Sequence, residues 1–297
     1  MANFIKWTEI AGINTNDLIK RATDRIIRKI DAISDDIIAH KDVKLIFICG
    51  PSGSGKTTFA NMLEDKLDGE GYESHTLSLD DFFKNREELP YIKDNLRDFD
   101  SIHSIDTDLV KKCFTELLSR NMSYVPRYDF IKGVREDNVR LLKINSNDVV
   151  IVEGIHSFHT LIQGDIERKH LINIYLEPVT ELIYDDGTPL KGKDLRLIRR
   201  IIRDLYTRGH SIDATIRQWR YVRQSEDINI YPFINNADYT IDTFAEYEIM
   251  VYKELLYPYL KLDGEKYAYL MKYFNEIPSL SPRVVPDNSI IKEFSKF

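Results

Sequence analysis

The chain has 297 residues, of which 43% are hydrophobic and 30% charged, and its formal net charge is −7. This composition predicts a globular protein and argues against a dedicated duplex-DNA-binding protein. No apolar run is long enough to span a bilayer, and the first residues lack the pattern of a secretory signal. Two cysteines are too few for a disulfide framework or a four-cysteine metal site. We therefore expect a cytoplasmic protein that binds neither membranes nor duplex nucleic acid.

The hydrophobic pattern predicts alternating helices and strands. Apolar residues recur with helical spacing from Asp17 to Ile38, and again from Thr57 to Leu67. Short apolar runs predict five strands, at Lys44–Cys49, His75–Leu79, Val149–Val152, Leu171–Leu176 and Tyr239–Ile241. This alternation predicts a three-layer α/β/α fold around a mainly parallel sheet.

One segment after the first predicted strand carries a phosphate-binding pattern. Residues 50–57 read GPSGSGKT and match G-x-x-x-x-G-K-[ST] at every fixed position. Glycines let the backbone N–H groups turn toward phosphate oxygens, Lys56 adds a positive charge, and the Thr57 hydroxyl can ligate Mg²⁺. The pattern predicts a P-loop that binds ATP or GTP with Mg²⁺. The residues expected to contact the nucleotide are Gly50, Ser52, Gly53, Ser54, Gly55, Lys56, Thr57 and Thr58.

Carboxylates follow two of the predicted strands. Asp80 comes directly after His75–Leu79, and Glu153 directly after Val149–Val152. Ligands of open α/β sheets bind beyond the carboxyl ends of the strands, where these acids are expected. Phosphoryl transfer to an alcohol needs one carboxylate for the hydroxyl proton and another on the metal side. We assign Asp80 as the base and Glu153 to Mg²⁺; the alternative is that each acid caps a helix or forms a turn.

A predicted helix from Asp194 to Arg208 is rich in arginine. Its arginines recur at helical spacing and place four guanidiniums on one face, at Arg196, Arg199, Arg200 and Arg203. Guanidiniums suit phosphate oxygens, so the pattern predicts a mobile lid that closes over a triphosphate. The alternatives are an RNA-binding face and a solvated face. The polar stretch from Tyr184 to Asp194 before the helix reads as an exposed loop.

These patterns predict three parts of the chain: an N-terminal helical extension at residues 1–42, a kinase domain at 43–245 with its lid at about 184–211, and a C-terminal helical appendage at 246–297.

Several motifs in order resemble the uridine kinase family of P-loop kinases, which includes phosphoribulokinase-like members. They are GPSGSGKTT (50–58), SLDDFF (78–83), RDFDSIHSID (97–106), PRYDFIKGVR (126–135), VVIVEG (149–154) and RLIRRIIRDLYTRGHS (196–211). The stretch at 208–219 and the ending PDNSIIKEF (286–294) are most similar to a bacterial nucleoside kinase branch.

The resemblance implies a role for each matching residue. Asp80 matches the family's base for the 5′-hydroxyl, and Asp100 the carboxylate that holds ribose hydroxyls. Among the remaining candidates, Thr57 and Glu153 match the magnesium side. The other matches are Phe83, Tyr128 and Phe130 in the aromatic wall of the substrate site, Arg196 as a substrate contact, Arg199 and Arg208 as nucleotide contacts, and Arg200 and Arg203 as catalytic arginines.

Two positions depart from the family pattern at the acceptor end. Phe83 stands where uridine kinases usually have tyrosine, and Gly133 stands where the pyrimidine-reading enzymes have histidine. A missing hydrogen-bond partner can change substrate choice strongly. The leading hypothesis is therefore an ATP-dependent kinase of a nucleoside 5′-hydroxyl. The alternatives are a kinase of another small alcohol, such as a sugar, sugar phosphate or pantothenate-like molecule, and a nucleotide-driven switch or RNA-associated protein. The sequence leaves open whether the chain forms a homo-oligomer.

Overall fold

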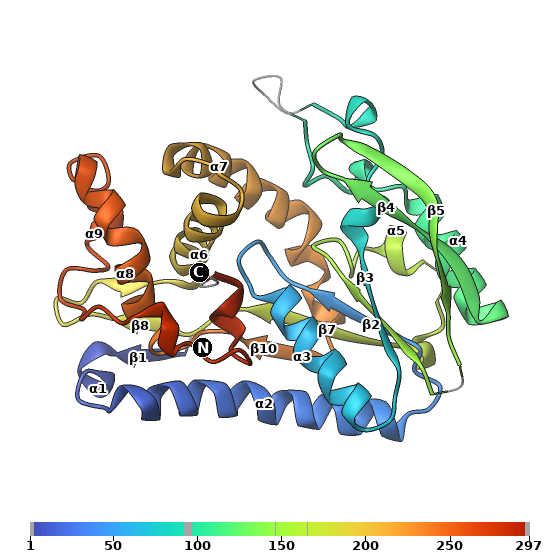
Figure 1. Ribbon diagram of the computed structural model, residues 1–297, viewed down its shortest axis with the longest axis horizontal. Coiled ribbons are helices and arrows are strands. Elements are labelled where there is room, and N and C mark those ends of the chain that lie inside the picture. The colour runs from blue at the N-terminus through green and yellow to red at the C-terminus, as the bar shows by residue number, and fades with distance from the viewer. Residues whose placement is uncertain (1–2, 92–96, 146, 165, 295–297) are drawn as a thin grey trace.

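A five-stranded parallel sheet forms the centre of the protein (Figure 1). The computed structural model describes residues 3–91, 97–145, 147–164 and 166–294. The strand order is β10-β7-β2-β6-β3. All five predicted strands are confirmed, with the bounds β2 Leu45–Cys49, β3 Ser74–Ser78, β6 Val149–Glu153, β7 Leu171–Glu177 and β10 Tyr239–Asp242.

The two faces of this sheet pack into separate hydrophobic clusters, which makes the fold three-layered. In β2, Ile46 and Ile48 face one cluster, while Leu45 and Phe47 face the other. The first cluster takes in α2 (Thr15–Ala39), α3 (Lys56–Gly69), α6 (Gly192–Thr207) and α8 (Glu248–Leu260). The second takes in α4 (Thr107–Arg120) and α5 (Thr160–Gln163). Strands covered on both faces are apolar throughout, which explains the continuous runs in the sequence.

The strand order creates a crevice at the end of β2. After β2 the chain moves to β3 and β6 on one side, and afterwards to β7 and β10 on the other. Ligands of such sheets bind where the order reverses, beyond the carboxyl ends of the strands. The segment directly after β2 is the predicted P-loop.

The N-terminal helix α2 packs against the helix of the P-loop. The side chain of Asn14 accepts a hydrogen bond from Asn16 N and caps the helix. Its buried apolar side chains lie against α3, and the helix runs along the lower edge of Figure 1. The C-terminal residues Tyr247 and Phe294 belong to the same cluster. The segments expected as extensions thus share one core with the sheet; their boundaries as separate parts stay a prediction.

An antiparallel hairpin that the sequence analysis did not predict lies beside α4 (Figure 1). It consists of β4 (Met122–Asp129) and β5 (Val134–Lys143). Its turn includes Gly133 at a φ of +75°, a conformation that favours glycine. Most of β5 is exposed, so it lacks the apolar run that marks the central strands.

The stretch 184–194 is not the exposed loop that its polar composition predicted. It contains β9 (Pro189–Leu190), which pairs with β8 (Glu181–Ile183), and β8 pairs with the N-terminal strand β1 (Phe4–Lys6). Tyr184 is buried and its hydroxyl donates to Tyr273 O at 2.8 Å. Residues 185–187 form an exposed turn as expected, but Tyr184 and Leu190 are buried because β9 folds back on the adjacent β8, which in turn pairs with the distant β1. The remaining helices are α1 (Trp7–Ile10), α7 (Ile212–Asn229) and α9 (Ala268–Met271).

Within the described part of the chain, no helix combines the length and apolar character needed to cross a membrane.

Candidate active site

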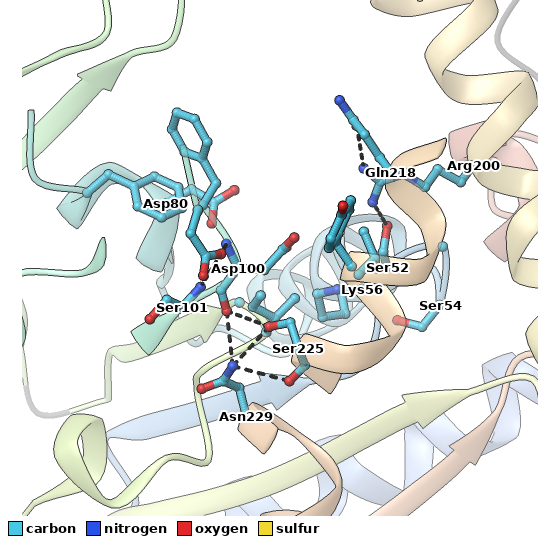
Figure 2. A pocket seen from close by; sticks show the side chains of 18 of the residues that line it. Ser52, Ser54, Lys56, Asp80, Asp100, Ser101, Arg200, Gln218, Ser225 and Asn229 are labelled. Carbon is cyan, nitrogen blue, oxygen red and sulfur yellow. Dashed lines mark hydrogen bonds between the residues drawn. The ribbon is translucent and has the colours of Figure 1, made fainter. Parts of the chain in front are cut away.

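One large cleft of about 1540 Å³ opens at the carboxyl ends of the central strands. Its walls come from the P-loop, the segments after β3 and β6, the C-terminal half of α6, and α7. Figure 2 shows Ser52, Lys56 and Arg200 on one side of the cavity, with Asp80 and Asp100 facing them from the other. The cleft therefore joins the predicted phosphate site to the predicted acceptor residues.

The P-loop owes its shape to glycines in tight surroundings. Gly53 and Gly55 have φ values of +77° and +92°, and Gly55 is the N-cap of α3. A Cβ atom on Gly53 would lie 2.9 Å from Arg196 O, and one on Gly50 would lie 2.3 Å from Leu176 O. The chain closes tightly here, and the N-terminus of α3 is directed at the loop. Unpaired N–H groups and the positive end of a helix dipole suit a bound phosphate.

Lys56 lies at the floor of this loop. Its Nζ atom donates to Gly50 O at 2.8 Å and to Pro51 O at 3.3 Å. These partners are neutral carbonyls, so an anionic phosphate oxygen would be a stronger acceptor for the same ammonium group. The next residue, Thr57, is exposed at the cleft, where its hydroxyl can reach a metal ion.

The two carboxylates predicted at the strand ends lie in the same cleft and are linked by Ser78. Ser78 Oγ donates to Glu153 Oε1 at 2.7 Å and accepts from Asp80 N at 3.4 Å. The Asp80 side chain is exposed to the cleft, yet the walls around it displace much of the water. This desolvation raises the pKa of Asp80 to about 7; repulsion from Glu153 adds to the effect and Lys56 opposes it. A carboxyl group with a pKa near neutrality suits proton transfer.

Residues around the P-loop fit a magnesium ion that takes most of its ligands from phosphate and water. Thr57 and Glu153 both line the cleft and supply oxygen atoms. The described residues include no group of three or more His, Cys, Asp or Glu side chains that could hold a metal by themselves. Mg²⁺ in phosphoryl-transfer sites is usually held in this way, by one or two carboxylates together with substrate phosphates and water.

The arginine face predicted on α6 is divided between the protein interior and the cleft. Arg196 and Arg199 are fully buried and do not line the cleft. Arg196 binds Glu226 through Nη1 and Nη2 at 2.6 and 3.0 Å, and Arg199 binds Glu248 through Nε and Nη2 at 2.8 and 2.9 Å. The expectation that Arg196 contacts the substrate and Arg199 the nucleotide therefore does not fit their positions.

These buried arginines hold the P-loop from behind. Arg196 Nη1 donates to Ser52 O at 3.1 Å, and Arg199 Nη1 donates to Gly53 O at 3.0 Å. Each guanidinium thus spans a carboxylate and a loop carbonyl, with geometry fixed by its planar fork. Because each of these positive charges is already paired with a carboxylate, we infer that the two residues position the loop. Other positively charged groups must then bind the phosphate.

The C-terminal half of α6 and the residue that follows it supply three arginines that reach the cleft. Arg200, Arg203 and Arg208 line it, and each places a nitrogen 3.3 to 3.4 Å from Asp204. Arg200 Nη1 also donates to Ser52 Oγ at 2.9 Å. Three guanidiniums share this one buried carboxylate, so positive charge remains for an anionic ligand.

Core packing limits how α6 can move. Its side chains Leu195, Ile198, Ile201 and Ile202 are buried in the cluster that covers the sheet. A lid movement of the whole helix would expose them, at a cost of about 1.5–3 kcal/mol for each side chain. The lid at about 184–211 stays a prediction. Because these side chains are buried, movement at low free-energy cost is confined to the residues of α6 after Ile202.

The acceptor end of the cleft joins Asp100 to an aromatic wall. Asp100 O accepts hydrogen bonds from Ser225 Oγ at 2.8 Å and Asn229 Nδ2 at 3.2 Å, both on α7 (Figure 2). Phe83 and Phe130 line the cleft with ring centroids 6.1 Å apart.

Tyr128 lies behind this wall and does not line the cleft. Its ring centroid is 5.6 Å from that of Phe83 and 5.0 Å from that of Phe130, and the side chain is buried. It therefore supports the rings and does not form the surface itself.

Most of the predicted site residues line this one cleft, and sequence reasoning missed others. The predicted site residues that do not line the cleft are Gly50, Thr58, Tyr128, Arg196 and Arg199. Those missed include Arg86, Arg97, His103, His159, Gln218, Tyr221, Ser225, Asn229 and Glu293. Ser225 and Asn229 are four residues apart on α7, so helical spacing could have placed them on one face. Gln218 and Tyr221 precede Ser225 on α7 by seven and four residues, and Arg97, His103 and Glu293 lie in the stretches 97–106 and 286–294. Nothing local marks Arg86 and His159.

A C-terminal segment also reaches the P-loop. The short helical turn Ile290–Phe294 packs against α3 and α6. A Cβ atom on Gly55 would lie 2.8 Å from Ile290 Cγ1, and the Arg199 guanidinium lies 5.3 Å from the Phe294 ring centroid. Glu293 lines the cleft 3.9 Å from Arg203. The loop is therefore packed between α6 and this distant segment.

Comparisons with known proteins show what this chain is similar to. Uridine kinase from Bacillus pumilus is 32% identical over 198 residues, covering 66% of this chain and 85% of that protein. Uridine kinase from Staphylococcus aureus is 30% identical over 202 residues, covering 68% and 88%. A solved structure described as a possible uridine kinase from Bacillus stearothermophilus is 19% identical, with a TM-score of 0.47 and coverage of 72% and 98%.

The family profile extends over most of the chain. The profile described as the phosphoribulokinase / uridine kinase family matches residues 45–250, which include the P-loop, both strand-end carboxylates, the hairpin and α6. The chain therefore belongs to the phosphoribulokinase / uridine kinase family of P-loop kinases.

Proposed function

We propose that this protein is an ATP- and Mg²⁺-dependent kinase that phosphorylates the hydroxyl group of a small molecule, with a nucleoside 5′-hydroxyl as the favoured acceptor. The observation that carries the proposal is the shared cleft, in which Lys56 and the arginines of α6 face Asp80 and Asp100. The uridine kinases that are similar to this chain support the nucleoside as acceptor.

Each group in the cleft has a task in this reaction. Lys56 and the N-terminus of α3 hold the β- and γ-phosphates, while Thr57 and Glu153 hold Mg²⁺, which would neutralise phosphate charge when bound. Arg200, Arg203 and Arg208 stabilise the charge on the transferred group.

Asp80 accepts the proton of the attacking hydroxyl, and its raised pKa brings the carboxylate into the range where it can hold that proton. Asp100 orients the acceptor beside it. The aromatic wall of Phe83 and Phe130 offers apolar surface for a planar base.

The proposal is tested by measuring ADP release with purified protein, ATP and Mg²⁺ against a panel of nucleosides and other small alcohols. We expect a nucleoside to stimulate ADP release well above the rate with water alone. Substitution of GTP for ATP in the same assay tests the nucleotide. If no acceptor raises ADP release above the background, the proposed function is wrong.

A further inference from the structure

We propose that Arg86 selects the acceptor, and that it favours molecules that present oxygen or nitrogen hydrogen-bond acceptors without an amino group at the end away from the phosphorylated hydroxyl. The inference rests on the proposed function and adds a specificity-determining residue to it. For nucleosides it predicts a preference for keto bases such as uracil and hypoxanthine over the amino bases cytosine and adenine.

The position of Arg86 is fixed by the turn of the hairpin. Arg86 N donates to Gly133 O at 2.8 Å, and Arg86 Nη2 donates to Phe130 O at 2.5 Å. The turn is held in shape by Asp129, whose Oδ1 accepts from the backbone N–H groups of Ile131 and Lys132 at 2.9 and 3.0 Å. The guanidinium is thus attached to the same backbone that presents the Phe130 ring.

Gly133 makes room for this side chain. A Cβ atom on Gly133 would lie 2.7 Å from both Cζ and Nε of Arg86, and 2.9 Å from its Cβ. Any larger residue at this position would have to displace the arginine, and the φ of +75° disfavours it as well. The guanidinium therefore occupies the space where a side chain from position 133 would begin.

The surroundings of Arg86 suit a planar ligand with polar edges. Arg86 lines the cleft together with the rings of Phe83 and Phe130. Behind them the side chain of Tyr128 is buried, with its hydroxyl close to the Arg86 guanidinium. Arg86 lies close enough to Tyr128 to oppose the rise in its pKa that burial causes.

A guanidinium has N–H donors and no acceptor, which decides what it can recognise. Besides the donors directed at Phe130 O and the Tyr128 hydroxyl, its remaining N–H groups can bind a carbonyl oxygen, such as O4 of uracil or O6 of hypoxanthine. An amino group at the same place would set donor against donor and leave polar groups unpaired, which discriminates strongly. A carboxylate oxygen satisfies the same donors, so the expected acceptors share an oxygen acceptor at the place where cytosine and adenine carry an amino group.

The test measures kcat/KM for three matched pairs of acceptors: uridine and cytidine, inosine and adenosine, and glycerate and glycerol. We expect the native protein to favour uridine over cytidine by about 5- to 150-fold, the range of one hydrogen bond from a charged donor to the keto oxygen O4. Arg86→Met should bring this ratio close to one without changing the KM for ATP. Arg127→Met serves as the control, because Arg127 lies on strand β4 of the hairpin and outside the cleft. This variant should keep the native ratio. The other two pairs show whether a keto base or a carboxylate supplies the oxygen acceptor.

A double-mutant comparison connects Arg86 to Gly133. Gly133→Ala should displace the guanidinium and lower the uridine-to-cytidine ratio, but it should have no further effect on that ratio in the Arg86→Met background. An unchanged KM for ATP shows that the folded site is retained. If turnover occurs but Arg86→Met leaves the ratios of all three pairs unchanged, the role of Arg86 is wrong and the proposed kinase activity stands. If no acceptor in the panel turns over, the proposed function itself fails.

Discussion

The two ends of the cleft are built in different ways. At the phosphate end, the P-loop is held by buried ion pairs, by glycines that leave no free space, and by a segment from the far end of the sequence. At the acceptor end, Phe130 is 52% exposed and lies in the turn of a hairpin whose second strand is mostly exposed. The phosphate end is built to bind one kind of group, whereas the exposed part of the acceptor end can change without disturbing the core.

The largest effect is expected at Asp80, where the two ends meet. Asp80→Asn keeps the shape of the side chain but removes the proton acceptor, so kcat should fall by about 10²- to 10⁴-fold. Binding of ATP, measured by isothermal titration calorimetry, should remain close to native because the P-loop is untouched. Near-native turnover in this variant would remove Asp80 from the role of base.

The buried ion pairs at the phosphate end should contribute more to the stability of the fold than exposed ion pairs do. Glu248→Gln leaves the fully buried Arg199 without a charged partner and should lower the free energy of unfolding by about 3–5 kcal/mol. The matched control is Asp24→Asn, which breaks an exposed pair with Lys20 and should change it by less than about 1 kcal/mol. Equal effects in urea titrations would contradict the difference between buried and exposed pairs.

The pH dependence of kcat/KM should report the environment of Asp80. The pKa of this group is raised to about 7, so its base form is lost as the pH falls through that value. Below pH 7 we expect kcat/KM to drop by up to about tenfold per pH unit. Because kcat/KM reports the free protein, a profile that stays flat down to pH 5 would contradict a raised pKa of Asp80.

The smallest effect should come from the exposed rim of the acceptor end. Phe130→Ala removes a ring that packs edge-on against Phe83 and Tyr128, and should raise the KM for the acceptor by about 2- to 12-fold. The KM for ATP should not change. Val139→Ala, a similarly exposed apolar residue on β5 outside the cleft, serves as the control and should leave both values native.

The well-packed and the exposed regions also differ in how much of their structure could be predicted from the sequence. The inner strands β2, β6 and β7 were predictable because strands buried on both faces are mostly apolar runs, and the P-loop because its glycines and lysine are adjacent in sequence. The hairpin was missed because an exposed strand has no such run. The position of Arg86 over Gly133 depends on a turn that brings together residues far apart in sequence.

The arginines of α6 show why a helical face is not enough to assign function. Spacing placed Arg196, Arg199, Arg200 and Arg203 on one side, but it could not show which of them meets a carboxylate. Their partners Glu226 and Glu248 lie on other helices, 30 and 49 residues away. Tertiary pairing therefore decides which arginines remain for a ligand.

The contact between Gly55 and Ile290 also has a consequence for synthesis of the chain. The two residues are more than two hundred positions apart, so the ribosome completes the P-loop long before the segment that covers it exists. Contacts of such high sequence separation form late in folding. The nascent chain must therefore carry its phosphate loop in an incompletely packed state during most of translation, and the loop reaches its final packing only after the segment around Ile290 has left the ribosome.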